Sequence, residues 1–221
     1  MTEQTFWDWD WVFDHLELIG DRLLQHVSLT LIAVGAGLLI SFPLAVLAYR
    51  RRKLYPPIAW VTGILYTIPS LALFAFLIPF TGLSILTAEI GLTSYTLLIL
   101  IRNTVTGLAG VPDDVKEAAH GMGYTGRQLL WRVELPLALP AVVAGVRIAS
   151  VTTIGLVTVT ALIGMGGLGS LMLGGFRQLY PEIMIVVGLV LSVALAVTFD
   201  GLLLAGQRVL TPWTARRAVA A

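Results

Sequence analysis

The sequence of 221 residues contains no cysteine and few charged residues. The absence of cysteine excludes disulfide frameworks, thiolate nucleophiles and cysteine-bound metals. Charged residues make up 12% and apolar residues 57% of the chain, whereas soluble domains carry about 25% charged residues. This balance predicts a protein that lies largely in lipid. The net charge of +1 leaves no basic surplus for binding phosphates, so nucleic acid is not expected as a partner.

The first 21 residues contain no Lys or Arg. A signal peptide opens with basic residues, so this segment is not expected to be a cleaved signal. Residues 6–13 are rich in aromatic side chains, with Asp8 and Asp10 between them, a composition typical of an amphipathic helix at a membrane surface; a cap over a substrate entrance is the alternative. We expect residues 1–26 to form an N-terminal segment at the outer surface.

Several motifs of enzymes and nucleotide-binding proteins are also missing. No phosphate-binding P-loop occurs, and Ser70 has no nucleophile-elbow sequence around it. His15, His26 and His120 are too far apart to suggest a metal site. Residues 164–169 fit G-x-G-x-x-G, but an apolar span rather than a strand precedes them, so they predict a close-packed turn. We therefore expect no enzymatic activity and no cofactor bound by this chain.

Five apolar stretches are long enough to cross a bilayer core, which needs roughly 20 helical residues. We expect membrane-spanning helices over 27–49, 57–79, 85–106, 140–163 and 182–204. Together they predict an all-α integral membrane protein with one transmembrane domain over 27–210. The longest polar stretch between spans, about 107–140, separates the third span from the fourth.

Basic residues gather on one side of these spans. Twelve of the fourteen Lys and Arg residues follow the first span, accompany the loop before the fourth, or follow the fifth; Arg22 and Arg177 are the exceptions. Basic residues near span ends are retained in the cytoplasm. The N-terminus is therefore expected outside, with the loop at 107–140 and a tail at 211–221 in the cytoplasm.

The polar loop carries signals for two short helices. Two residue pairs have the spacing of a capping box: Asp114 with Glu117, and Thr125 with Gln128. Gly121 and Gly123 favour the positive φ that ends a helix, whereas Pro136 should end the second helix and Pro140 should begin the fourth span. Such a loop would be a passive connector, would grip lipid headgroups, or would dock another protein. Its basic candidates for headgroups are Lys116, Arg127 and Arg132.

The spacing within this loop resembles the EAA loop of ABC importer permeases. That pattern is EAA, three residues, Gly, nine residues, Ile, one residue, and Leu-Pro. The matching residues here are Glu117, Ala118, Ala119, Gly123, Val133, Leu135 and Pro136. Val133 in place of Ile is the one departure and is conservative in size. The resemblance implies that residues 117–123 form a coupling helix that contacts a separate ATP-hydrolysing subunit.

Three further segments are similar to permeases that import quaternary-amine osmoprotectants such as glycine betaine, choline and carnitine. They are TIPSLAL at 67–73, RNT at 102–104 and LIGMGGLG at 162–169. Methionine importer permeases are also similar and are the alternative. The resemblance implies a bacterial or archaeal cell membrane, partner ATPase subunits that bind Mg-ATP, a second permease copy or related permease, an extracytoplasmic solute-binding protein, and membrane lipid.

Polar groups and prolines inside the spans are candidates for the translocation path. They are Tyr66, Pro69, Ser70, Thr152 and Thr153. Pro69 should kink its span and free a backbone carbonyl, which would form a gate or be satisfied by a neighbour's hydroxyl. Arg147 and Asp200 lie in the inner thirds of the last two spans. Because charge in a membrane is unfavourable, they should pair with each other or each reach the cytoplasmic surface.

A secondary transporter or channel subunit is the hypothesis from a different class. It would predict internal repeats or intramembrane acid relays, and neither is evident in the sequence. A membrane-bound enzyme has no catalytic constellation to support it.

Overall fold

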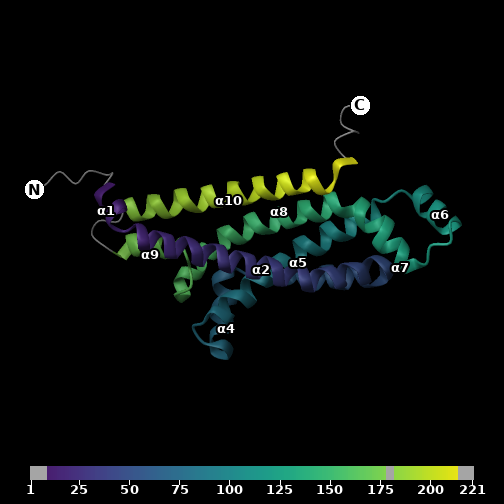
Figure 1. The fold of residues 1–221 in the computed structure, drawn as a ribbon. Helices are drawn as coiled ribbons and strands as arrows, with labels where there is room; N and C mark the ends of the chain where they lie inside the picture. Colours follow the sequence, from purple (N-terminus) through teal and green to yellow (C-terminus); the bar gives the residue numbers. More distant parts are fainter. Residues whose placement is uncertain (1–8, 178–181, 214–221) are drawn as a thin grey trace, which may run out of the picture.

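A computed structural model describes residues 9–177 and 182–213. Every regular element in these ranges is helical (Figure 1). The long helices are α2 (Leu16–Arg50), α5 (Ile85–Ala109), α8 (Leu135–Val159) and α10 (Glu182–Leu210). The shorter ones are α1 (Trp9–Asp14), η1 (Arg52–Leu54), α3 (Tyr55–Thr67), α4 (Ser70–Thr81), α6 (Asp113–Gly121), α7 (Gly126–Leu129), the π-helical turn η2 (Leu130–Glu134), η3 (Thr160–Ile163) and α9 (Gly169–Arg177). The predicted all-α fold is confirmed.

Four helical segments are long and apolar enough to cross a membrane. They are α2, α5, the continuous run from Gly126 to Ile163, and α10. The expected second span is not one straight helix, because α3 and α4 meet at an angle of 95°. Counting this bent pair as one span gives the predicted five.

The first helix is longer than the apolar stretch that predicted it. It begins at Leu16 rather than near residue 27. The added turns carry Ile19, which packs in a buried cluster with Leu168 and Leu171. Packing against a distant segment therefore accompanies a helix that is longer than the apolar stretch needed to cross a bilayer. Residues 1–8 of the expected N-terminal segment and 214–221 of the expected tail lie outside the described residues.

The core of the bundle forms where α5 packs between α2 and α8. One buried cluster joins residues of α2, α4, α5, α8 and η3: Leu29, Ala33, Phe74, Ala88, Leu92, Val157 and Ile163. Small residues allow the helix backbones to approach closely, as is usual in membranes. A β-carbon on Gly145 would lie 2.6 Å from the Asn103 side chain, and one on Gly107 would lie 3.0 Å from the Ala138 carbonyl oxygen.

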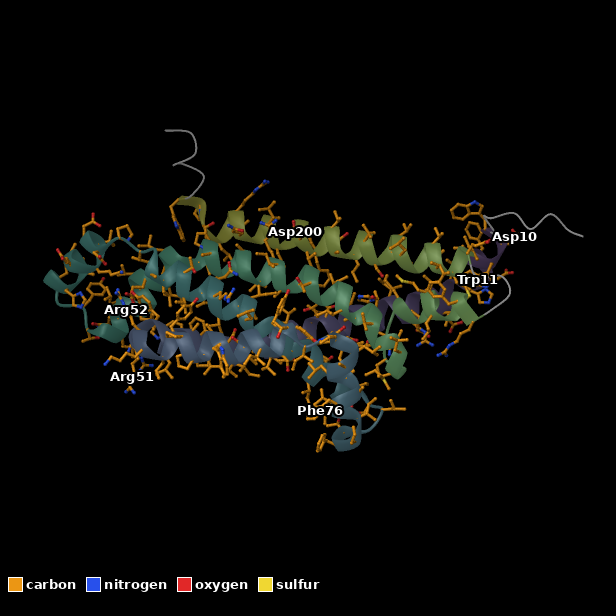
Figure 2. The ribbon with its side chains drawn as sticks, turned by 180° about the vertical axis from the view of Figure 1, so that it is seen from behind. Asp10, Trp11, Arg51, Arg52, Phe76 and Asp200 are labelled. Atoms are coloured by element: carbon orange, nitrogen blue, oxygen red, sulfur yellow. The ribbon has the colours of Figure 1, made fainter. Side chains whose placement is uncertain are left out.

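The long helices run side by side, and four of the short helices lie at their ends (Figure 1). The loop helices α6 and α7 lie at one end, and α1 and α9 lie at the other. Arg51 and Arg52 share the end with α6 and α7, opposite Asp10 and Trp11 (Figure 2). The α4 helix, which bears Phe76, projects sideways from the bundle. The polar loop thus forms a distinct knob at one end.

Candidate functional site

The first loop helix, α6, begins two residues earlier than its expected capping box requires. Pro112 is the N-cap, and no side chain caps the helix. Asp114 therefore lies inside the first turn, and the predicted capping box with Glu117 is wrong. Asp113 and Asp114 instead place negative charge in the first turn, where it complements the helix dipole.

The turn after α6 uses one glycine rather than two. Gly123 has φ of +82°, as predicted, whereas Gly121 is the last residue of α6 and does not have positive φ. Thr125 and Gln128 form the second predicted capping box: each side chain bonds the other residue's backbone N–H. The predicted order of helix, glycine turn and helix is confirmed.

The two prolines of the loop do not act as predicted. The chain remains helical from α7 through the π-turn η2 into α8, so Pro136 does not end a helix. Pro136 is the second residue of α8, directly after the π-turn; because the helix is continuous there, its missing N–H removes one donor from the helix. Pro140 lies inside α8 rather than in the first turn of a separate span.

The loop is fastened to the end of α2 by contacts from both of its helical parts. The Tyr49 hydroxyl donates a 2.6 Å hydrogen bond to Glu134 Oε1, and Glu134 is only 5% exposed. Arg50 Nη2 donates a 2.9 Å bond to the Gly126 carbonyl oxygen. Lys116 Nζ lies 5.9 Å from the centroid of the Tyr49 ring. The Tyr49–Glu134 hydrogen bond could not be predicted from sequence spacing, because the two residues lie 85 positions apart.

The EAA-type residues divide between an exposed edge and a packed base. Glu117, Ala118 and Gly123 are exposed, and Ala119 is buried. Val133, Leu135 and Pro136 are half-buried at the base of the knob. Burial tends to lower the pKa of Lys116, but its 3.1 Å contact with Asp113 and its proximity to Tyr49 outweigh this and raise that pKa. The exposed edge of α6 is a surface available to a partner.

The break between α3 and α4 lies at Ile68 and Pro69. The Tyr95 hydroxyl of α5 donates a hydrogen bond to the Ile68 carbonyl oxygen. Tyr66 stacks edge-on against the Tyr95 ring, with centroids 5.9 Å apart. The expected kink is confirmed, and the hydroxyl of a neighbouring helix satisfies the Ile68 carbonyl oxygen at the break.

Arg147 of α8 and Asp200 of α10 pair with each other. Arg147 Nε and Nη2 lie 2.8 and 2.7 Å from the two carboxylate oxygens of Asp200. The pair borders an open groove of about 470 Å³ that Thr152 also lines. The sequence predicted either that these two residues pair or that each reaches the cytoplasmic surface, and the structure shows that they pair.

The expected path residues fall into separate places within one chain. Tyr66, Pro69 and Ser70 surround the α3–α4 break, whereas Thr152 lines the groove beside α10. Thr153 is buried inside the bundle. No hydrogen bond or ring contact among the described residues joins the two sets, and their role in a translocation path stays a prediction.

The glycine-rich run forms a close-packed turn rather than a nucleotide site. Gly164 and Gly167 have φ of +84° and +48°. A β-carbon on Gly167 would lie 2.8 Å from the His26 backbone. His26 is buried, and its Nε2 lies 3.0 Å from the Ile154 carbonyl oxygen. No group of metal-ligating side chains occurs among the described residues.

Glu89 is an intramembrane acid that sequence reasoning passed over. It lies on α5, and both carboxyl oxygens are buried with no hydrogen-bond partner among residues 9–177 and 182–213. An ionisable residue within a membrane span is unusual and marks a position of interest. The sequence did offer a signal for this residue, because Glu89 is an acidic residue inside the third expected span.

Comparison with known proteins identifies the family. Residues 34–212 match the model of the binding-protein-dependent transport system inner membrane component. The osmoprotectant import permease protein OsmW of Salmonella typhimurium is 38% identical over 207 residues, covering 91% of this chain and 96% of that protein. The choline transport system permease protein OpuBB of Bacillus subtilis is 37% identical over 205 residues, covering 91% and 94%.

Solved structures show the same architecture. A chain of the MetNI methionine ABC transporter in an inward-facing conformation superposes with a TM-score of 0.80 and 26% identity, covering 90% of this chain and 98% of that one. The family assignment excludes the enzyme hypothesis and favours an ABC importer over a secondary transporter or channel. The chain belongs to the binding-protein-dependent transport system inner membrane component family: it is a multi-pass permease subunit of an ABC importer in the cell membrane, and a partner ATPase hydrolyses the ATP.

Proposed function

We propose that this permease carries a quaternary-amine osmoprotectant such as glycine betaine, choline or carnitine. The observation that carries the proposal is 37–38% identity, over 91% of this chain, to permeases named for osmoprotectant import and choline transport. The methionine transporter shares the fold at 26% identity, so methionine is the second candidate solute.

The knob formed by α6, α7 and η2 is the proposed coupling element, and the exposed edge of α6 is its proposed contact with the ATPase. Glu117, Ala118 and Gly123 supply its exposed edge, and Ala119, Val133, Leu135 and Pro136 pack it onto the bundle. The bonds from Tyr49 and Arg50 support this role, because a docked partner can move the bundle only through a firmly attached element.

The same end of the bundle is proposed to be cytoplasmic. Arg51 and Arg52 lie there beside the loop helices (Figure 2), and basic residues are retained on the cytoplasmic side. The end with α1 and α9 would then face outward, where a solute-binding protein delivers its cargo. The separation of Tyr66, Pro69 and Ser70 from Thr152 supports a path completed by a second copy or a related permease.

Solute-stimulated ATPase activity of the reconstituted complex tests this function. The permease, its ATPase and its solute-binding protein are placed in liposomes with betaine, choline, carnitine or methionine. We expect stimulation by one or more quaternary amines and none by methionine. Stimulation by methionine alone would reject the solute assignment while keeping the importer.

Variants of the knob test the coupling role in the same assay. Glu117→Lys and Gly123→Asp should abolish solute-stimulated ATPase activity or release the ATPase during purification. Asp114→Lys and Gly121→Asp are matched controls, because both residues are exposed on α6 outside the motif. Equal losses in variants and controls would show that the effect is not specific to the motif.

A further inference from the structure

The surface of α7 and η2 contains a groove that the coupling role does not use. The groove has a volume of about 430 Å³ and is lined by Thr125, Arg127, Gln128, Trp131 and Arg132. It is therefore polar and basic, with one aromatic wall.

The cations of this groove are not neutralised by the protein. No carboxylate among the described residues lies within 4.0 Å of the Arg127 or Arg132 guanidinium; the ion pairs in those ranges are Lys116–Asp113 and Arg147–Asp200. Gln128 uses its side-chain oxygen in the capping box, so its amide N–H groups remain available as donors. An anion would satisfy all of these donors at once.

The groove lies beside the end of α2. Arg50 is the last residue of α2, and its bond to the Gly126 carbonyl oxygen places the start of α7 at that level. Trp131 is 52% exposed, and its ring centroid lies 5.9 Å from that of Phe42 in α2. Tryptophan favours the headgroup layer of a bilayer, so Trp131 marks this face as the membrane interface.

The groove is also separate from the exposed edge of α6. Figure 1 shows α7 beside the end of α2 and α6 set away from it at the same end of the bundle. A partner that docks on Glu117 and Ala118 can therefore leave the α7 face in contact with lipid.

We propose that this groove binds the phosphodiester headgroup of an anionic phospholipid. Arginine forks match phosphate oxygens with paired, charge-assisted hydrogen bonds. Basic pockets beside membrane spans on the cytoplasmic side attract anionic headgroups. Trp131 and Phe42 line the boundary with the hydrocarbon, where the glycerol backbone and first methylenes of the lipid would lie.

Lipid binding to the intact permease–ATPase complex tests the proposal. Dioleoyl phosphatidylglycerol or dioleoyl phosphatidylcholine is titrated into the detergent-solubilised complex, and bound lipids are counted by native mass spectrometry. We expect the wild type to prefer phosphatidylglycerol. Arg127→Gln/Arg132→Gln should weaken that binding by about tenfold, because it removes the charge-assisted contacts, and should leave phosphatidylcholine binding unchanged.

Two control variants separate a specific groove from general charge. Arg51→Gln/Arg52→Gln removes the same charge at the same end but outside the groove, and should keep the preference. Arg127→Lys/Arg132→Lys keeps the charge without the fork, and should bind with intermediate affinity. Equal weakening in the two glutamine variants would overturn the proposal. Loss of the ATPase from Arg127→Gln/Arg132→Gln with unchanged lipid binding would also overturn it and assign the groove to the ATPase interface.

Discussion

The Tyr49 hydroxyl joins the last turn of α2 to Glu134 in the π-turn that leads into α8, over a distance of 2.6 Å. Lys116 of α6 lies over the same Tyr49 ring. Three segments far apart in the chain therefore meet at one side chain. A displacement of α6 by a bound ATPase would reach both α2 and α8 through this contact.

Tyr49→Phe should weaken coupling between ATP hydrolysis and transport. Phenylalanine keeps the ring beneath Lys116 but removes the donor to Glu134, and leaving a buried acceptor unsatisfied costs about 1–3 kcal/mol. We expect fewer solute molecules transported per ATP hydrolysed in proteoliposomes. Tyr55→Phe is the control, since no hydrogen bond of the Tyr55 hydroxyl occurs among the described residues. An unchanged transport-to-ATP ratio in Tyr49→Phe would contradict a coupling role for this bond.

Arg147→Ala and Asp200→Ala should have non-additive effects. Each single change strands the other charge, so the double variant should lose little more than either single variant. Transport and the yield of assembled complex are measured for all four members of the cycle. Additive losses would mean that the two side chains act independently despite their 2.7 and 2.8 Å contacts.

Tyr95→Phe should destabilise the α3–α4 break. The Ile68 carbonyl oxygen would lose its donor in apolar surroundings, with a penalty of about 1–3 kcal/mol, while the ring contact with Tyr66 would remain. A lower thermal unfolding midpoint in detergent is expected. Tyr66→Phe alters the other ring of the pair without removing this bond, and it should unfold close to the wild type. Equal midpoints for Tyr95→Phe and the wild type would argue against the bond.

Three glycine-to-alanine changes should rank by backbone strain and contact. Gly164→Ala places a β-carbon at positive φ in open space and should cost about 1–2 kcal/mol. Gly167→Ala adds a 2.8 Å approach to His26 and should cost more. Gly35→Ala lies in a helix with nothing nearby and should stabilise by about 0.5–1 kcal/mol. Thermal unfolding of the three variants gives the order, and a reversed order would refute the packed-turn interpretation.

Glu89→Gln should raise the thermal unfolding midpoint. A buried carboxyl group without a partner is unfavourable, and a neutral amide of the same shape lessens that cost. Glu17→Gln, at an exposed site on α2, should change stability by less than about 0.5 kcal/mol. A lower midpoint in Glu89→Gln would show that the carboxylate has a partner outside the described residues, such as a second permease copy.

The sequence was informative wherever a local rule governs the structure. Apolar length located the spans, because a bilayer of fixed thickness demands it. Gly123 and the Thr125–Gln128 pair were predictable because turn and cap chemistry act over three or four residues. The capping box at Asp114 failed because the helix takes Pro112 as its N-cap and so begins two residues earlier, and local spacing does not resolve such a shift.

The break at Pro69 shows which features follow from the local sequence and which depend on tertiary packing. The proline itself predicts a kink, because it removes a donor and crowds the preceding turn. The 95° angle and the identity of the satisfying hydroxyl, Tyr95, depend on where α5 packs. The same holds for α2, which extends to Leu16 because Ile19 meets Leu168 and Leu171.

The sequence by itself thus determined that the chain spans a membrane with an EAA-type loop, since composition, span length and motif spacing are properties of the chain alone. Only the tertiary structure decided which polar groups meet: Tyr49 with Glu134, Arg147 with Asp200, and Arg127 and Arg132 around one groove. In each case the contact follows from how helices pack across many intervening residues, and in an apolar medium that packing decides which charges and hydrogen-bonding groups find a partner.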